Sequence, residues 1–330
     1  MKSMSMSSRL ALVLAVFAGL PGLVQAAEEK IFRTGLTAEC RSFAVSPTGE
    51  SLVFDTAKLV NGIRLIDLKT GAIQILPSEP GRNWEMARWS NDGKHLVAVS
   101  TLVRDNNYVI RDQRVILIDP RGWSHRAIAS GEGVKIFPFF SADGTKIYYF
   151  KGKARTSGMT IAAGFDLFSV DLVSGQEAKQ TDESFYQVSV GDVSEDGGFV
   201  HFSARGGRTF GHLKDVHGVE GSYLLKYDAR TKRLARIAIN NPNKIFELSR
   251  PRMDNAGGLY FKAAIRGDKG YFVYSLFKVN KEGESPQRLA GIPIWANFEL
   301  VKRTGDVYIP DIQQADLVFR RLVPNSIQVQ

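Results

Sequence analysis

The chain has 330 residues and a formal net charge of +9, and 44% of its residues are hydrophobic. This content is too high for an intrinsically disordered chain and sufficient for a buried core. The single cysteine, Cys40, excludes an intrachain disulfide and every multi-cysteine zinc or iron–sulfur site. Because Cys40 precedes an apolar segment, we expect a buried structural thiol rather than a reactive one.

The first 26 residues have the pattern of a secretory signal peptide. Lys2 and Arg9 flank a polar start, residues 10–20 are apolar, and small residues end the segment at Ala26. A membrane anchor is the alternative, but about 11 apolar residues fall short of the roughly 20 that span a bilayer. We therefore predict cleavage after Ala26 and a periplasmic mature protein without a membrane span. Its net charge falls from +9 to +7.

A turn signature of Ser, a spacer, Asp or a substitute, and Gly recurs along the remaining chain. Successive glycines of this signature lie 44 to 60 residues apart, near the period of a four-stranded propeller blade. The last two of the six copies are weaker. The copies are Ser46–Gly49, Ser90–Gly93, Ser141–Gly144, Ser194–Gly197, Asp254–Gly257 and Lys302–Gly305.

Each signature glycine lies between two apolar segments, which is typical of a hairpin whose turn requires a positive φ. A third strand and a shorter, more polar fourth strand follow in each unit. The sequence therefore predicts an all-β fold, a six-bladed β-propeller of four-stranded antiparallel blades over residues 27–330. The expected third strands are 64–67, 115–119, 167–171, 223–228 and 276–280.

The sixth unit is one strand short. It offers segments 297–301, 306–309 and 316–323, after which the chain ends. Residues 30–33 lie outside the first unit, and we expect them to supply the missing outer strand of the last blade. This closure removes an edge that would otherwise invite aggregation.

The repeats resemble those of the TolB-like β-propeller family. The resemblance rests on the segments FPFFSADG at 137–144, ARWSNDG at 87–93 and DLKTG at 67–71, and it covers nearly all of residues 27–330. It implies a propeller architecture and little about activity. Only about 20 residues separate the signal peptide from the first turn, so the separate domain that precedes the propeller in TolB is not expected.

Units two to five carry insertions between their second and third strands, at residues 102–113, 151–165, 204–221 and 263–270, with a summed charge of +5. These connections emerge on one face of a propeller, so we predict a basic binding face there. The alternative for the charged residues is a surface that only keeps the protein soluble. The alternative for the aromatic residues is packing between neighbouring blades. The predicted binding-face residues are Arg104, Arg111, Lys153, Arg155, Arg205, Arg208, His212, Lys214 and Arg266, with Trp84 and Trp295 from the links between blades.

No residue pattern predicts catalysis. The chain has no Gly-x-Ser-x-Gly elbow, and the glycine-rich segment 203–212 lacks the Gly-Lys-Ser/Thr ending of a phosphate loop. His212 and His217 flank Asp215, but zinc needs a further ligand and the other histidines belong to other units. We therefore predict no catalytic residue, no cofactor and no metal site.

The sequence favours a non-catalytic binding or scaffold protein of the cell envelope. Its expected partner is an envelope protein or an anionic envelope ligand, and not nucleic acid, which an exported protein does not meet. The alternative is a glycan hydrolase or lyase at the channel mouth, because propellers host many activities. A channel cation would need inward-facing oxygen ligands. The sequence does not determine the partner or the oligomeric state.

Overall fold

The structure of the chain is a computed structural model that describes residues 29–37, 39–56, 62–105, 107–154, 162–214, 220–240, 245–266 and 271–323. The expected signal peptide and the residues Arg155, Asp215 and His217 lie outside these ranges. All regular elements within these ranges are strands, and no helix there is long and apolar enough to cross a membrane.

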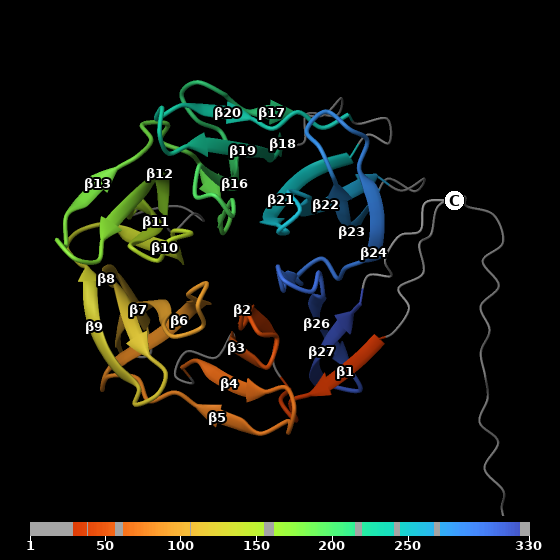
Figure 1. The fold of residues 1–330 in the computed structure, drawn as a ribbon. Coiled ribbons are helices and arrows are strands. Elements are labelled where there is room, and N and C mark those ends of the chain that lie inside the picture. Colours follow the sequence, from red (N-terminus) through yellow and green to blue (C-terminus); the bar gives the residue numbers. More distant parts are fainter. Residues whose placement is uncertain are drawn as a thin grey trace, which may run out of the picture.

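Six antiparallel sheets surround a central channel (Figure 1), as the repeats predict. In the first three blades, consecutive strands pair from the channel outward. Blade 1 contains β2 (Cys40–Val45), β3 (Ser51–Thr56), β4 (Arg64–Asp67) and β5 (Ile73–Ile75). Blade 2 contains β6 (Arg82–Trp89), β7 (Leu96–Arg104), β8 (Asn107–Asp119) and β9 (Ser124–Ala129). Blade 3 contains β10 (Val134–Phe140), β11 (Lys146–Ala154), β12 (Ala162–Asp171) and β13 (Glu177–Lys179).

In blade 4 the inner strand is divided into two short strands that both pair with the next strand. Gly191 lies between them, where a Cβ atom would come within 2.7 Å of the Phe139 ring. The blade contains β14 (Gln187–Val188), β15 (Asp192–Val193), β16 (Phe199–Arg205), β19 (Tyr223–Asp228) and β20 (Leu234–Arg236). Blade 5 contains β21 (Ile245–Met253), β22 (Leu259–Arg266), β23 (Phe272–Val279) and β24 (Gln287–Gly291).

The N-terminal strand closes the ring, as predicted. Blade 6 has the order β25 (Glu299–Leu300), β26 (Val307–Gln313), β27 (Asp316–Leu322) and β1 (Glu29–Arg33), and β1 lies beside β27 in Figure 1. The Phe32 ring lies 6.1 Å from the Tyr308 ring, and the Thr34 hydroxyl donates a hydrogen bond to the Leu317 carbonyl at 2.8 Å. These contacts join the two ends of the propeller.

Side-chain hydrogen bonds fix the first turn of the blades. The Ser141 hydroxyl donates to Asp143 at 2.6 Å and accepts from the backbone N–H of Lys146 at 2.9 Å. Ser90 and Ser194 make the equivalent contacts. All six signature glycines have φ between +68° and +83°, a conformation that glycine adopts without strain.

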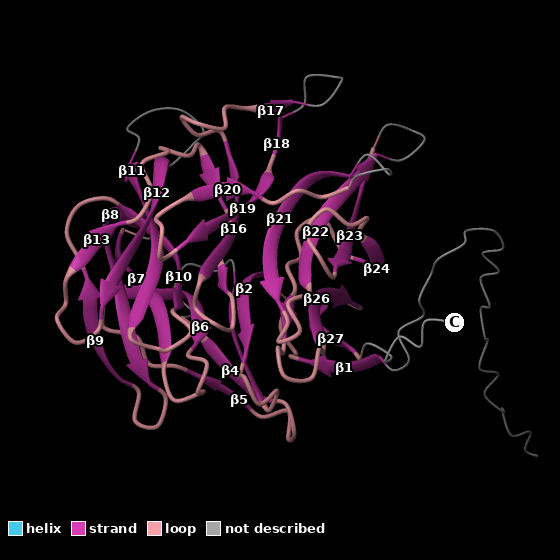
Figure 2. Cartoon of the chain, turned by 45° about the horizontal axis from the view of Figure 1, so that its top comes forward, coloured by secondary structure: helices cyan, strands magenta, loops and turns pink. Residues whose placement is uncertain are grey.

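The insertions of blades 2, 3 and 5 extend their hairpins as paired strands. The paired region reaches Arg104 opposite Asn107 in blade 2, and Ala154 opposite Ala162 in blade 3. Blade 4 instead adds the hairpin of β17 (Leu213–Lys214) and β18 (Glu220–Gly221), which stands out from the ring in Figure 2. We call this side of the ring the insertion face and the opposite side, where the Ser-x-Asp-Gly turns lie, the turn face.

The hydrophobic core lies between neighbouring blades. The Phe150 and Phe202 rings meet edge to face at 5.1 Å between blades 3 and 4. Trp84 is fully buried between blades 1 and 2. Cys40 is buried as expected, and burial raises the pKa of its thiol.

Removing β1 tests the closure. We expect a chain that begins at Thr34 to have a free energy of unfolding about 2 kcal/mol or more below that of residues 27–330, because the contacts of Phe32 are lost and β27 becomes an edge. Urea unfolding measures the difference. An Ile75→Ser variant, at a position 60% exposed on the outer strand of blade 1, is the control and should stay within about 0.5 kcal/mol. Equal stability of the truncated and full-length mature chains would contradict the assigned closure.

Candidate functional site

The turn signature determines which side chains line the central channel. The residue four positions before the first residue of each turn lines its narrowest part in five blades, namely Ser42, Met86, Phe137, Val190 and Arg250. In blade 6 the degenerate turn is preceded by Asn297, five positions earlier, at this level. The residue two positions before each turn lines the cavity on the turn face, namely Ala44, Arg88, Phe139, Asp192, Arg252 and Leu300.

Three of these channel residues have an unusual backbone conformation. Met86, Phe137 and Arg250 have φ values of 58°, 53° and 56°, and the register of their strands shifts beside each of them. Such bulges redirect a side chain, and a left-handed φ at a non-glycine residue carries strain. The cavity at this level has a volume of about 20 Å³, close to the volume that one water needs. We call this part of the channel the waist, and it lies between two larger cavities.

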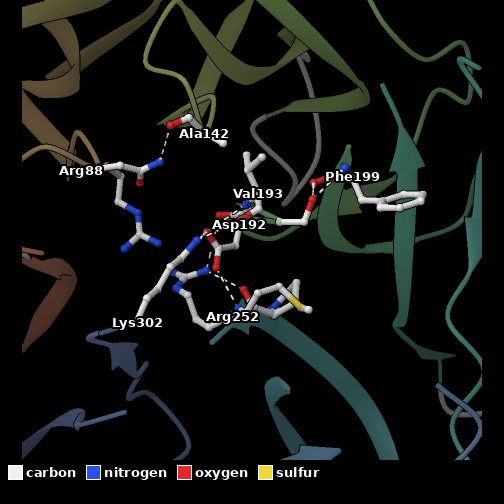
Figure 3. A network of polar contacts seen from close by, with 12 residues as sticks. Arg88, Ala142, Asp192, Val193, Phe199, Arg252 and Lys302 are labelled. Carbon is white, nitrogen blue, oxygen red and sulfur yellow. Dashed lines mark hydrogen bonds and ion pairs between the residues drawn. The ribbon is translucent and has the colours of Figure 1, made fainter. Parts of the chain in front are cut away.

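The cavity on the turn face has a volume of about 400 Å³, and the second residue of each turn rings it. Its wall contains a charged network in which Asp192, Arg252 and Lys302 converge (Figure 3). Arg252 binds Glu299 at 2.7 and 3.2 Å, and Arg88 pairs with the same carboxylate. Lys302 binds Asp192 at 2.8 Å.

This network connects blades 2, 4, 5 and 6 and leaves its charges paired. Burial alone would raise the pKa of Glu299, but the charges of Arg252 and Arg88 hold it below its usual value. Breaking a buried pair leaves an uncompensated charge, so each partner keeps the other in place. We therefore assign these residues to holding the blades together across the channel.

The cavity on the insertion face has a volume of about 290 Å³, and we call it the insertion-side cavity. Its charged lining consists of Arg205, Arg250 and Lys262 against one carboxylate, Glu247. Its neutral lining is rich in hydroxyl and amide groups and includes one indole: Gln187, Ser189, Ser203, Ser222, Ser249, Asn297 and Trp295.

Two of the three cations in this cavity have partners. Lys262 donates to the carbonyl oxygens of Ile294 at 2.6 Å and Ala296 at 2.7 Å, so it fixes the link that carries Trp295. Burial lowers the pKa of Lys262 to about 8. Arg205 is paired with Glu247.

Arg250 differs from both. No hydrogen bond or ion pair to its guanidinium is found within the described part of the chain, although the residue lines both the waist and the insertion-side cavity. Burial, and then the charge of Arg252, lower its pKa to about 10, so it remains a cation at neutral pH. It is a positive charge at the base of a polar cavity.

A second hollow on the insertion face has a volume of about 500 Å³ and lies over blade 3. We call it the blade 3 groove; four cations and two carboxylates line it, namely Arg111, Lys151, Lys153, Lys179, Glu132 and Asp166. Lys151 pairs with Glu177 at 2.8 Å and Lys179 with Asp166 at 3.1 Å. Arg111 and Lys153 are exposed and have no ion pair with another described residue.

The structure divides the predicted binding-face residues among several places. It brings Arg111 and Lys153 together in the blade 3 groove, and Arg205 and Trp295 together in the insertion-side cavity. Trp84 must be removed from the set, because its side chain is 0% exposed and packs between blades. Arg104 and Arg266 are exposed at hairpin tips, Arg208 is exposed and paired with Asp182, and His212 is exposed beside Tyr186. The side chain of Lys214 in β17 and the whole of Arg155 lie outside the described part of the chain.

Sequence reasoning missed Arg250 and the paired charges of the turn face. A signal for most of them was present, since their offset from each turn is constant. The offset places Arg88, Asp192 and Arg252 two positions before their turns and Arg250 four positions before. Glu299 lies before the weakest turn, where the offset is no guide. The described residues contain no group of three His, Cys, Asp or Glu side chains that could hold a metal ion.

Two buried carboxylates lie beside the channel between blades 1 and 2. Asp55 accepts hydrogen bonds from the Ser42 hydroxyl and the Met86 N–H, both at 2.7 Å, and so links the two blades. Glu85 accepts from Thr101 at 3.0 Å and lies 3.6 Å from Arg41. Burial, and then the charge of Asp55, raise the pKa of Glu85 to about 7.

Comparisons with solved structures identify the architecture as a TolB-like β-propeller. Similar chains are TolB from Acinetobacter baumannii (13% identity, TM-score 0.52, covering 84% of this chain and 62% of that chain) and a chain assigned to TolB from Agrobacterium tumefaciens (15%, 0.58, 90% and 98%). Another is oligogalacturonate lyase from Vibrio parahaemolyticus (12%, 0.53, 86% and 77%). Searches with protein-family models and against curated proteins give no match. The comparisons confirm the TolB-like architecture at the level of the fold.

The raised pKa of Glu85 predicts a pH-dependent stability. A carboxyl whose pKa is higher in the folded state stabilises the fold below its unfolded pKa, near 4.5, and this contribution is lost as pH rises through about 7. Relative to a Glu85→Gln variant, the wild type should lose about 3 kcal/mol of unfolding free energy between pH 4.5 and 8. Urea unfolding at several pH values measures the difference. Parallel curves for the two proteins would contradict the assignment.

Proposed function

We propose that the chain is a non-catalytic binding or scaffold protein of the cell envelope. The signal peptide of residues 1–26 directs it to the periplasm, and the insertion face recognises an acidic protein surface or an anionic envelope ligand. One observation carries the proposal: two hollows on the same face each have two more cations than carboxylates in their lining. An anionic partner complements such a face, and the ring holds the lining in place.

The paired charges of the turn face support the insertion face as the binding side. Arg88 and Arg252 share Glu299, and Lys302 is bound to Asp192, so these charges have partners within the propeller. Arg111 and Lys153 have no such partners among the described residues and lie exposed in the blade 3 groove. Exposed cations without internal partners can pair with an incoming anion at little cost of rearrangement.

The alternative is a carbohydrate-active enzyme at the channel mouth. Oligogalacturonate lyases are among the similar structures, one of them in complex with manganese, and this favours a glycan as ligand. The carboxylate in the lining of the insertion-side cavity, Glu247, pairs with Arg205 and accepts a hydrogen bond from Tyr274 at 2.6 Å. A carboxylate held in this way is a poor general base, so we place the enzyme second.

Charge reversal in the blade 3 groove tests the proposed function. We expect Arg111→Glu combined with Lys153→Glu to weaken binding of an envelope partner at least about tenfold, because two attractive charges become repulsive. The partner is captured from an envelope fraction on immobilised residues 27–330, and its affinity is then measured at low and high salt. The wild-type interaction should weaken as salt increases.

The matched control is Lys69→Glu combined with Lys94→Glu. It makes the same change of net charge at exposed positions on the turn face. Retained binding by this control and lost binding by the groove variant support the proposal. Equal loss in both would mean that only net charge matters, and turnover of oligogalacturonate by the purified protein would favour the enzyme.

A further inference from the structure

The unpaired guanidinium of Arg250 distinguishes the insertion-side cavity from the rest of the channel. Arg88 and Arg252 have a shared carboxylate, and Lys262 has backbone carbonyl partners. Arg250 is half-buried, Glu299 acts on it only as a charge beyond ion-pair distance, and no acceptor among the described residues hydrogen-bonds its guanidinium. A partly desolvated cation without an acceptor is costly. An anion bound in the cavity would supply the missing acceptor.

The geometry of a guanidinium narrows the class of anion. Its fork of N–H donors matches the two oxygens of a carboxylate, and such bidentate pairs are among the stronger hydrogen bonds of proteins. Because one such cation is available in the cavity, a single carboxylate on the ligand suffices to pair with it.

The neutral lining indicates what the rest of the ligand carries. The Ser189 and Ser203 hydroxyls hydrogen-bond to each other at 2.7 Å, and the Ser189 hydroxyl can also donate to the Val190 carbonyl at 3.4 Å. When Ser189 donates to Ser203, the Ser203 proton is available for a ligand acceptor. The amide of Asn297 donates to the Arg41 carbonyl at 3.1 Å and keeps its oxygen as an acceptor. The exposed amide of Gln187 offers both a donor and an acceptor. Ligand hydroxyl groups can use both kinds of site.

Trp295 supplies an apolar surface in the lining of the cavity; it is half-buried and also packs against two of the hydrophobic clusters. It lies on the link that Lys262 fixes through the Ile294 and Ala296 carbonyls, so the indole is held in place before a ligand arrives. A rigid aromatic side chain beside polar groups suits a ligand with one carbon face and several hydroxyls. The cavity of about 290 Å³ lies near the lower limit for small-molecule sites.

We propose that the insertion-side cavity binds a polyhydroxylated carboxylic acid, with its carboxylate on Arg250, its hydroxyl groups on the serine and amide side chains, and its carbon face toward Trp295. The acid is either a free hydroxy acid or a uronic acid unit of a glycan. This proposal deepens the proposed function and rests on it for the choice of face. It assigns the cavity a small ligand of its own, apart from the blade 3 groove.

Calorimetric titration of residues 27–330 tests the proposal with defined probes. D-glucuronate, an oligosaccharide of glucuronate units and open-chain gluconate carry both the carboxylate and the hydroxyls. Glucose lacks the carboxylate, acetate lacks the hydroxyls, and inorganic phosphate tests for a general anion site. We expect glucuronate or gluconate to bind at least about tenfold more tightly than glucose, acetate or phosphate. Tighter binding of the oligosaccharide identifies a glycan as the source, and tighter binding of gluconate identifies a free acid.

The Arg250→Met variant should weaken binding of the preferred acid at least about tenfold, and Arg250→Lys should weaken it less. Lys69→Met, at an exposed position on the turn face, is the matched control and should leave this affinity unchanged. If Arg250→Met does not fold, Ser203→Ala and Gln187→Ala replace it, and each should weaken binding of the acid. Unchanged affinity in the cavity variants, or glucose binding as tightly as glucuronate, would overturn the proposal.

The two proposals fail separately. If the Arg111→Glu and Lys153→Glu variant retains its envelope partner while Arg250→Met loses the acid, the cavity ligand stands and the proposed role of the groove is wrong. If the groove variant loses the partner while Arg250→Met binds the acid as the wild type does, the cavity proposal is wrong and the binding module stands.

Discussion

The hydrogen-bonded turn at the end of each inner strand is the constraint on which the channel depends. In three blades a serine hydroxyl binds an aspartate two residues later and accepts the N–H of the residue five later. This pins the register of the first hairpin, and a slip of one residue would send every side chain to the other face. The same offset from the turn therefore reaches the same height in the channel in five blades.

Charge is distributed unequally along this channel because the blades contribute different residues at equivalent positions. At the turn face, Arg88, Arg252 and Glu299 come from three different blades and satisfy one another across the opening. At the waist, the positions equivalent to Arg250 are neutral, and Glu299, the carboxylate in its lining, pairs with Arg88 and Arg252 and not with Arg250. The pairing is thus a property of the ring and not of any single blade.

The sequence was sufficient for the fold and insufficient for the site. Turn residues act locally, so their spacing predicted the blades. The missing strand of the sixth unit predicted closure by residues 30–33, which the structure confirms as β1 (Glu29–Arg33). Trp84 and Trp295 were predicted alike, yet Trp84 is an inner-strand residue of blade 2 buried against blade 1, whereas Trp295 lies on a link between blades. The lack of an ion-pair partner for Arg250 among the described residues could not be predicted, because it depends on which side chains face one another across the ring.

Arg250 combines two costs at one position, a left-handed φ of 56° and a guanidinium without an internal acceptor. Neither cost serves the packing of blade 5, since Met86 and Phe137 show that an apolar side chain fits the same bulge in other blades. The fold tolerates both because β21 pairs with β22 before and after the bulge. A strained backbone and an unpaired charge, both held in place by the surrounding structure, are typical of binding positions rather than of core positions. The insertion-side cavity is therefore the part of the channel that an incoming ligand would stabilise.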